Sequence, residues 1–339
     1  MKRTMKKVNW ERFPDERLLQ MRIRDLGLSI HGSPLESLIE NLYEELDAKG
    51  IKFRPLCYLA DEWFCPDGEA IIGIPFFLAH PRLKHIEQKM MFEVEGGTET
   101  SCMKLLRHET GHALNHAYRL YKKTRWRQLF GSYTSKYSNA YYFQPYSKRF
   151  VIHLDDNYAQ AHPDEDFAET FAVWLTPDTS WESKYKDWPA IRKLRYVDGL
   201  IKKISNESPI KVSQGKPPWS ASRMTSTLSA YYERKRKYFG EEFKGFYDDT
   251  LEELFSRENI TTPREKASKI LRKHRLELVE NISRWTGHRK YDIHQLLNRL
   301  IDRCDALELY GEEKDLVEAA TLITAIAGNT LRTPKRNKH

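Results

Sequence analysis

The chain has 339 residues, of which 40% are hydrophobic and 12% aromatic, and this composition excludes a wholly disordered protein. Its formal net charge is +8, but acidic and basic residues alternate along most of the sequence. Such mixing is typical of a solvated surface, so we expect no nucleic-acid partner. The length favours one main domain with a smaller companion.

Apolar segments and cysteines bear on the cellular compartment. The longest apolar stretch, residues 70–79, is too short for a membrane span and contains Pro75. Charged residues follow the basic segment 1–10, where a secretory signal would be apolar. The four cysteines are Cys57, Cys65, Cys102 and Cys304. None forms a C-x-x-C pair, so we expect free thiols in a cytoplasmic protein without a membrane partner. The sequence does not indicate the oligomeric state.

The N-terminal part predicts a helical lead-in followed by two strands. Residues 15–49 are charged and helical in pattern, with a break at Gly32-Ser33-Pro34. Residues 53–83 are rich in aromatic and branched side chains and contain the turn signal Pro66-Asp67-Gly68. The second predicted strand, residues 70–77, includes a proline, which a sheet tolerates chiefly at its edge.

Two longer helices follow. The first begins after Gly96-Gly97, where Thr98 or Thr100 can cap it. Its predicted core positions are Met103, Leu106, Ala113, Ala117 and Leu120. The second begins at Pro163 with three acidic residues in its first turn, where the helix dipole favours them, and ends at Thr176-Pro177. Phe167, Phe171 and Trp174 are its predicted core positions.

The C-terminal third predicts a helical module. A linker is expected at residues 214–222, which contain Gln214-Gly215-Lys216-Pro217-Pro218. A capping box at Thr262-Pro263-Arg264-Glu265 predicts a helix that runs towards Gly287. Two further helices are predicted near residues 291–310 and 313–327, and the remaining basic residues form a frayed tail.

The first long helix carries the pattern His108-Glu109-Thr110-Gly111-His112. Two histidines four residues apart project from one helix face, so both imidazoles can reach one tetrahedral Zn²⁺. Glu109 points beside the metal, where it can act as a general base on a zinc-activated water. Gly111 has no side chain and therefore lets backbone or substrate approach the metal closely.

A catalytic zinc needs a third protein ligand and an open fourth position. Glu165 and Glu169 lie four residues apart on the second helix, hence on one face. We expect Glu165 to bind the metal and Glu169 to accept a hydrogen bond from a ligating histidine. Other residues compete for the third position: His153, His162, Asp164 and Asp166. His116, one turn beyond His112, is expected at the surface or behind the ligands.

These motifs resemble the bacterial "putative zinc-binding metallopeptidase" family. Residues 108–114 look like the first zinc-binding helix of gluzincin-type HExxH peptidases, and residues 162–172 look like a lethal-factor-type second motif. The likeness covers about residues 55–200. It implies that Tyr158, seven residues before Glu165, donates a hydrogen bond to the oxyanion, although a packed aromatic is the alternative. The N-terminal cysteine-rich zinc ribbon of some members has no counterpart here.

The resemblance and the motifs together predict an α+β fold. A zincin-like catalytic domain, residues 1–213, would have a small mixed sheet with an edge strand over the HExxH helix. After the linker, residues 223–331 would form an all-helical module, followed by the tail 332–339. By strand addition, the edge strand would bind an extended peptide substrate along Ile72, Ile74 and Phe76.

The predicted activity is zinc-dependent hydrolysis of peptide or related amide bonds by a metalloprotease. Two alternatives remain open at this point: a non-catalytic partner-binding protein on a zincin scaffold, and an amidase that acts on a non-protein substrate. Zinc content separates the predicted enzyme from a metal-free scaffold. The sequence does not indicate the substrate's identity or the cleavage preference.

Overall fold

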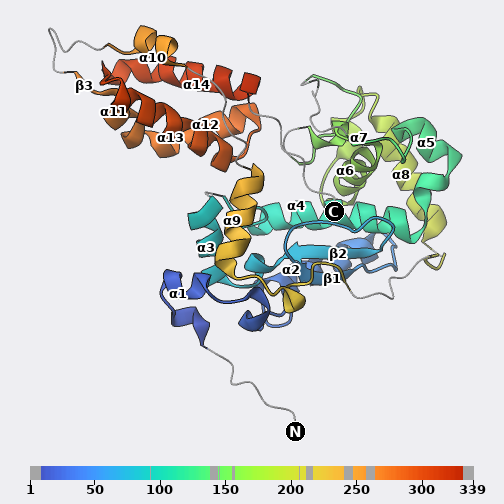
Figure 1. The fold of residues 1–339 in the computed structure, drawn as a ribbon. Coiled ribbons are helices and arrows are strands. Elements are labelled where there is room, and N and C mark those ends of the chain that lie inside the picture. Colours follow the sequence, from blue (N-terminus) through green and yellow to red (C-terminus); the bar gives the residue numbers. More distant parts are fainter. Residues whose placement is uncertain are drawn as a thin grey trace. The chain divides into compact units, whose positions relative to one another are not determined.

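The computed structural model describes residues 9–91, 93–137, 144, 146–154, 157–205, 207–210, 217–239, 247–256 and 264–330 (Figure 1). Contacts divide the chain into two compact units. The first takes in described residues up to 89 and from 94 to 231, and the second takes in those from 232 onward with the few between 89 and 94. Residues 214–216 of the predicted linker and the predicted tail lie outside the described residues.

Helices make up most of the first unit. In chain order they are α1 (Asp15–Leu19), α2 (Pro34–Ala48), α3 (Pro81–Met91), α4 (Glu99–Ala117), α5 (Thr124–Phe130), α6 (Pro163–Leu175), α7 (Trp181–Lys184) and α8 (Ile191–Ile204), and α9 (Leu228–Phe239) crosses the boundary. The predicted break at Gly32-Ser33-Pro34 is confirmed, because the Ser33 side chain caps α2 and Pro34 is its first residue.

The sheet of the first unit consists, among its described residues, of two strands, β1 (Leu56–Ala60) and β2 (Ile71–Pro75). They run parallel, with Leu56 opposite Ile71, so the predicted mixed sheet is wrong. Residues 61–70 form a crossover between the two strands instead of the tight turn of an antiparallel hairpin. Phe64, within this crossover, exchanges two backbone hydrogen bonds with Gly73 on β2.

The predicted substrate strand lies mostly inside the unit. Ile72 and Ile74 on β2 have fully buried side chains. The strand ends at Pro75, so Phe76 begins the 3-10 helix η3 (Phe76–Ala79) instead of continuing the strand. Since Phe64 occupies the backbone of β2 at Gly73, strand addition at that point requires Phe64 to move. The role of β2 in binding substrate stays a prediction.

Helices α4 and α6 pack together and carry the candidate site. Thr98 caps α4 in a capping box with Ser101, which confirms one of the two predicted caps. The helix ends at Ala117 rather than at Leu120, because Arg119 adopts a left-handed backbone with φ of 49°. A Cβ atom at Gly111 would lie 2.8 Å from Cα of Ala168, so the two helix backbones nearly touch there. The packing of α6 thus needs a glycine at position 111, and the predicted approach of backbone or substrate to the metal stays a prediction.

The second unit packs short helices around an apolar core. They are α10 (Asp248–Leu254), α11 (Ala267–Lys273), α12 (Arg275–Thr286), α13 (Lys290–Ala306) and α14 (Leu316–Thr330). The core draws its buried residues from all five of these helices, with Leu271, Ile293 and Ala327 among the most buried. The unit is not all-helical, since β3 (Glu265–Lys266) and β4 (Tyr310–Gly311) form an antiparallel pair.

The predicted long helix of the second unit is also corrected. Glu265 lies in β3 and the helix begins only at Ala267, so the capping-box prediction is wrong; Thr262 and Pro263 lie outside the described residues. The helix is interrupted at His274, between α11 and α12. Gly287 does end α12, in the left-handed conformation with φ of 72° that glycine adopts without strain.

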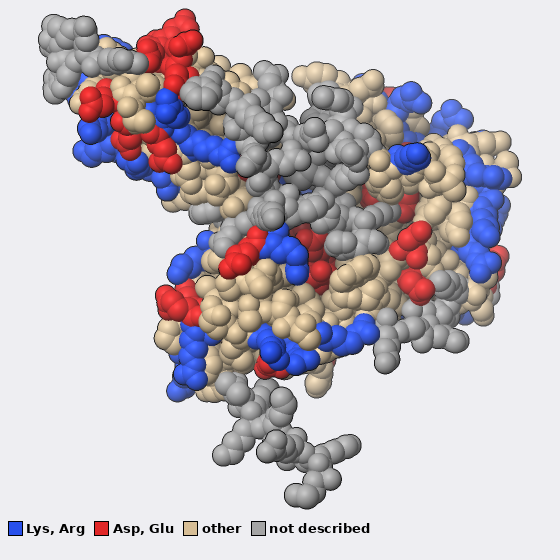
Figure 2. Space-filling view, in the orientation of Figure 1, with Lys and Arg blue, Asp and Glu red and all other residues tan. Residues whose placement is uncertain are grey.

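The distribution of charge on the surface and the state of the cysteines can be compared with the predictions made from the sequence. On the face shown in Figure 2, cationic and anionic side chains are interspersed among uncharged ones. All four cysteines are free thiols, as predicted. Across the described ranges, every helix is too short or too polar to traverse a bilayer.

Candidate metal centre

Helix α4 places two histidines side by side in the interior. His108 and His112 lie one turn apart, and their ring centroids are separated by 4.8 Å. Both are almost fully buried, with exposed fractions of 2% and 3%. Nearly all of α4 from Cys102 onward is buried, because it packs against α2 and β2 as well as α6. The surrounding packing therefore restricts both imidazoles.

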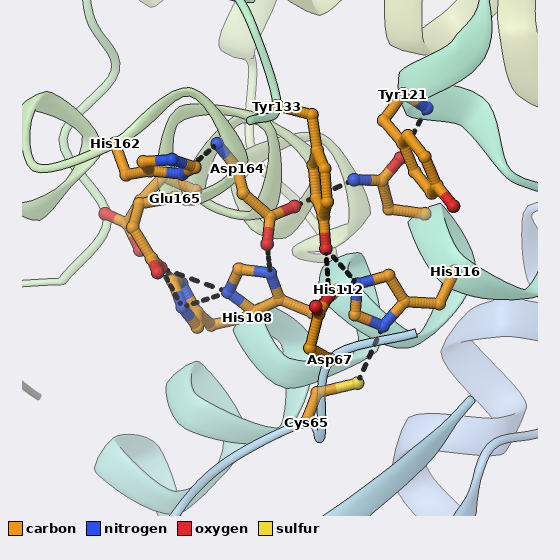
Figure 3. A network of polar contacts seen from close by, with 12 residues as sticks. Cys65, Asp67, His108, His112, His116, Tyr121, Tyr133, His162, Asp164 and Glu165 are labelled. Atoms are coloured by element: carbon orange, nitrogen blue, oxygen red, sulfur yellow. Dashed lines mark hydrogen bonds and ion pairs between the residues drawn. The ribbon is translucent and has the colours of Figure 1, made fainter. Parts of the chain in front are cut away.

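Glu165, in the first turn of α6, completes a three-residue cluster (Figure 3). Its Oε2 atom lies 3.1 Å from Nε2 of His108 and 3.0 Å from Nε2 of His112. The two Nε2 atoms are themselves 3.1 Å apart. The described residues contain this one group of three metal-ligating side chains with mutually close ligand atoms. His108, His112 and Glu165 could therefore hold a metal ion.

The outer ring nitrogens of both histidines face carboxylates. Nδ1 of His108 donates to Oε1 of Glu169 at 2.8 Å, and Nδ1 of His112 lies 2.9 Å from Oδ2 of Asp164. A proton on each Nδ1 leaves a lone pair on each Nε2. Three electron-rich atoms then converge on one point, so the cluster requires a positive charge at its centre.

Either a proton or a metal ion can supply that charge. Burial disfavours a charged His108, yet the hydrogen bonds with Glu165 and Glu169 outweigh burial and raise its pKa. In the metal-free protein a proton on Nε2 can thus stabilise the cluster. Two imidazoles and one carboxylate are also the donor set of many catalytic zinc sites. The residues present therefore fit Zn²⁺, whose binding would release such a proton.

The two supporting carboxylates are themselves held in place. The backbone N–H of Leu154 donates to Oε2 of Glu169 at 2.9 Å. Burial alone would raise the pKa of Glu169, but the hydrogen bonds with His108 and Leu154 and the charges of His108 and His153 together outweigh burial, and the pKa is lowered. Asn115 donates through Nδ2 to Oδ1 of Asp164 at 2.8 Å. The carboxylates of Glu169 and Asp164 therefore orient both imidazoles through their Nδ1 atoms.

The residues that competed with Glu165 have other partners. His162 caps α6: its Nδ1 accepts from the backbone of Asp164, and its Nε2 donates to the Ser135 carbonyl at 2.9 Å. His153 donates to the Lys104 carbonyl at 3.0 Å. Asp164 supports His112, as described above.

Asp166, the fourth competitor, forms a buried ion pair with Lys193 at 2.6 Å. Burial raises the pKa of Asp166 to about 7, although Lys193 opposes the shift. Asp166 is thus paired with Lys193 and is not one of the three clustered residues. Glu165 is therefore the acidic residue of this turn whose carboxylate faces both Nε2 atoms.

The predicted general base and oxyanion donor lie near the cluster. Glu109 follows His108 on α4 and is 6% exposed. Tyr158 begins the 3-10 helix η5 (Tyr158–Gln160) and is 8% exposed. Its ring centroid lies 5.7 Å from that of His108. Tyr158 is thus placed beside a candidate metal ligand, and the chemical roles of Glu109 and Tyr158 stay predictions.

Two contacts of the site were missed from the sequence. One is the support of His112 by Asp164, described above. The other is Tyr137, whose hydroxyl donates to Oε1 of Glu165 at 2.9 Å. Burial, and then the Glu165 carboxylate, raise the pKa of Tyr137 well above its usual range. No sequence signal singles out Tyr137 among 18 tyrosines, because its partner is 28 residues away.

The third histidine of α4, His116, contacts Tyr133 and Cys65 (Figure 3). His116 is 3% exposed, so its predicted place at the surface is wrong. Its Nδ1 donates to the Glu69 carbonyl at 2.8 Å, and its Nε2 lies 2.9 Å from the Tyr133 hydroxyl. The sulfur of Cys65 lies 3.6 Å from the same Nδ1. This network fixes the crossover between β1 and β2 to α4.

Comparison with known proteins agrees with the geometry. Residues 99–186 match the model of a family described as "Putative zinc-binding metallo-peptidase". The matched segment runs from the start of α4 to just beyond α7 and includes His108, His112 and Glu165. Among curated proteins and solved structures, none matches the chain significantly.

Proposed function

We propose that this protein is a zinc-dependent metallopeptidase that hydrolyses peptide or related amide bonds, with a zincin-like catalytic domain in its first unit. The observation that carries the proposal is the convergence of His108, His112 and Glu165 within a buried cluster. The family match, which spans the same residues and names a zinc-binding peptidase, supports it independently.

The donor set favours catalysis over a purely structural role for the metal. Structural zinc sites usually have four protein ligands, whereas catalytic sites have three and leave one position for water or substrate. This cluster offers three. When bound, a zinc ion supplies a Lewis acid that polarises the substrate carbonyl and lowers the pKa of water.

Glu109 is the proposed general base. This role is supported by its place in the sequence of α4, between the two histidines, and by its not being one of the three clustered residues. Glu109 would take a proton from the attacking water and later deliver it to the leaving amine. Low exposure of Glu109 strengthens such proton transfer, because bulk water competes little for the carboxylate.

Tyr158 is the proposed donor to the negative charge that develops on the substrate oxygen. A preorganised hydroxyl at that point lowers the barrier, since its hydrogen bond strengthens as the charge forms. The proximity of its ring to His108 supports this role. Substrate binding along β2 is part of the same proposal, but it requires the Phe64 bridge to open.

A digest of a defined peptide mixture tests the activity. The purified, zinc-loaded protein should cleave peptides, as seen by mass spectrometry of new termini. Cleavage should stop after the metal is removed with a chelator and return when one equivalent of zinc is added. Cleavage that persists without metal would contradict the mechanism. A zinc-loaded protein that cleaves nothing in the mixture would favour a partner-binding role instead.

A further inference from the structure

The contact between Tyr137 and Glu165 has a direct consequence for how the carboxylate can bind a metal. Oε2 of Glu165 faces the two imidazole nitrogens, whereas Oε1 accepts the Tyr137 hydroxyl proton at 2.9 Å. The two oxygens of one carboxylate thus have different partners. Oε2 is the oxygen that lies within 3.1 Å of Nε2 of both His108 and His112.

Neighbouring contacts fix Tyr137 in this position. Its ring stacks on the imidazole of His162, with centroids 3.8 Å apart and planes 13° from parallel. His162 in turn caps α6, the helix that bears Glu165, and donates to the carbonyl of Ser135, two residues before Tyr137. Tyr137 and Glu165 are therefore held by the same helix N-terminus.

The segment that carries Tyr137 is also anchored further upstream. Tyr133 stacks on Tyr121 with ring centroids 4.3 Å apart, and its hydroxyl contacts His116 and Asp67. Neither of these two partners belongs to the candidate metal cluster. Tyr133 and Tyr137 are both partly buried and each places its hydroxyl on polar partners, but of the two it is Tyr137 that contacts a candidate metal ligand.

We propose that Tyr137 is the positioning residue that keeps Glu165 a one-oxygen ligand and so keeps the fourth coordination position open. This inference rests on the proposed zinc site. A carboxylate whose second oxygen is free can bind through both oxygens and fill an additional position. With Oε1 occupied by the Tyr137 hydroxyl, Glu165 binds through Oε2 alone. A residue that orients a metal ligand through a hydrogen bond also contributes to the affinity of the site for its metal.

The Tyr137→Phe variant tests this role because it removes the hydroxyl and keeps the ring that stacks on His162. We expect zinc affinity, measured by competition with a chelator, to fall about 10- to 100-fold. With Co²⁺ in place of zinc, visible absorption should weaken, because higher-coordinate Co²⁺ absorbs less than four-coordinate Co²⁺. Circular dichroism of the metal-free variant establishes that the fold is retained.

Tyr133→Phe is the matched control. It removes a tyrosine hydroxyl from the same segment, but one that contacts His116 and Asp67 instead of a candidate ligand. Its zinc affinity and Co²⁺ spectrum should equal those of the wild type. Equal changes in both variants would assign a general structural role to the segment and overturn the proposal, as would an unchanged Tyr137→Phe protein.

X-ray absorption of the zinc-loaded wild type gives a second test that needs no variant. We expect four nitrogen or oxygen ligands and a carboxylate bound through one oxygen. A carboxylate bound through both oxygens would overturn the role of Tyr137 while leaving the zinc site intact. A wild-type protein that takes up neither zinc nor Co²⁺ would instead refute the metal site and, with it, the proposed function.

Discussion

Replacing Glu109 with glutamine should reduce peptide hydrolysis by about 100- to 10,000-fold, the usual contribution of a general base. The amide has nearly the shape of the carboxylate but cannot take a proton from water. Zinc content should stay at the wild-type level, because Glu109 is not one of the three clustered ligands. The measurement is kcat/KM for a peptide identified in the digest, together with metal analysis of the same preparation.

Glu99→Gln serves as the control for this substitution. Glu99 lies on the same helix, in its exposed first turn, ahead of both histidines. The same chemical change there should leave hydrolysis within a few-fold of the wild type, since a surface charge at a helix N-terminus contributes only about 0.3–1 kcal/mol. Full activity in Glu109→Gln would show that another group acts as the base.

Gly111→Ala should destabilise the protein by about 1–3 kcal/mol, the usual cost of overpacking a core. The added methyl group would meet Cα of Ala168 at 2.8 Å and its carbonyl oxygen at 3.1 Å. Because these atoms are backbone, α6 must move as a whole. That movement carries Glu165 away from the histidines of α4, so zinc affinity should fall together with the melting temperature of the metal-free protein.

The predicted loss of stability runs against the usual effect of this substitution, because alanine normally stabilises a helix interior by about 0.5–1 kcal/mol relative to glycine. A destabilised Gly111→Ala protein would therefore point to the close contact with α6. Gly199 on α8 provides the comparison, since a Cβ atom there meets nothing within 4 Å. Gly199→Ala should therefore raise the melting temperature and leave zinc affinity unchanged. A Gly111→Ala protein as stable as the wild type would show that α4 and α6 do not approach as closely as described.

Local patterns in the sequence predict the parts of the site that lie on single helices. The four-residue interval between His108 and His112, and that between Glu165 and Glu169, each define one helix face. The start of α4 at its cap Thr98 and the start of α6 at Pro163 follow from the same local chemistry. The expectation that a catalytic zinc has a third protein ligand then predicted that the face with His108 and His112 meets the face with Glu165.

Features set by contacts between distant segments could not be predicted. Asp164 and Asp166 are both acids in the first turn of α6, and spacing does not show that one contacts His112 and the other Lys193. The parallel pairing of β1 and β2 depends on how residues 61–70 cross over, which the turn signal at Pro66 does not specify. The interruption at His274 and the short β3–β4 pair likewise lack a sequence pattern that we recognised.

Metal analysis of the wild type and of two histidine variants of α4 tests the central claim most directly. After dialysis against metal-free buffer, the zinc-loaded wild type should keep one zinc ion per chain. His112→Gln should lose it, whereas His116→Gln, one turn further along, should keep it, because His116 lies in the network of Glu69 and Tyr133. A wild type without zinc, or a His112→Gln protein that retains a full equivalent, would contradict the metal centre.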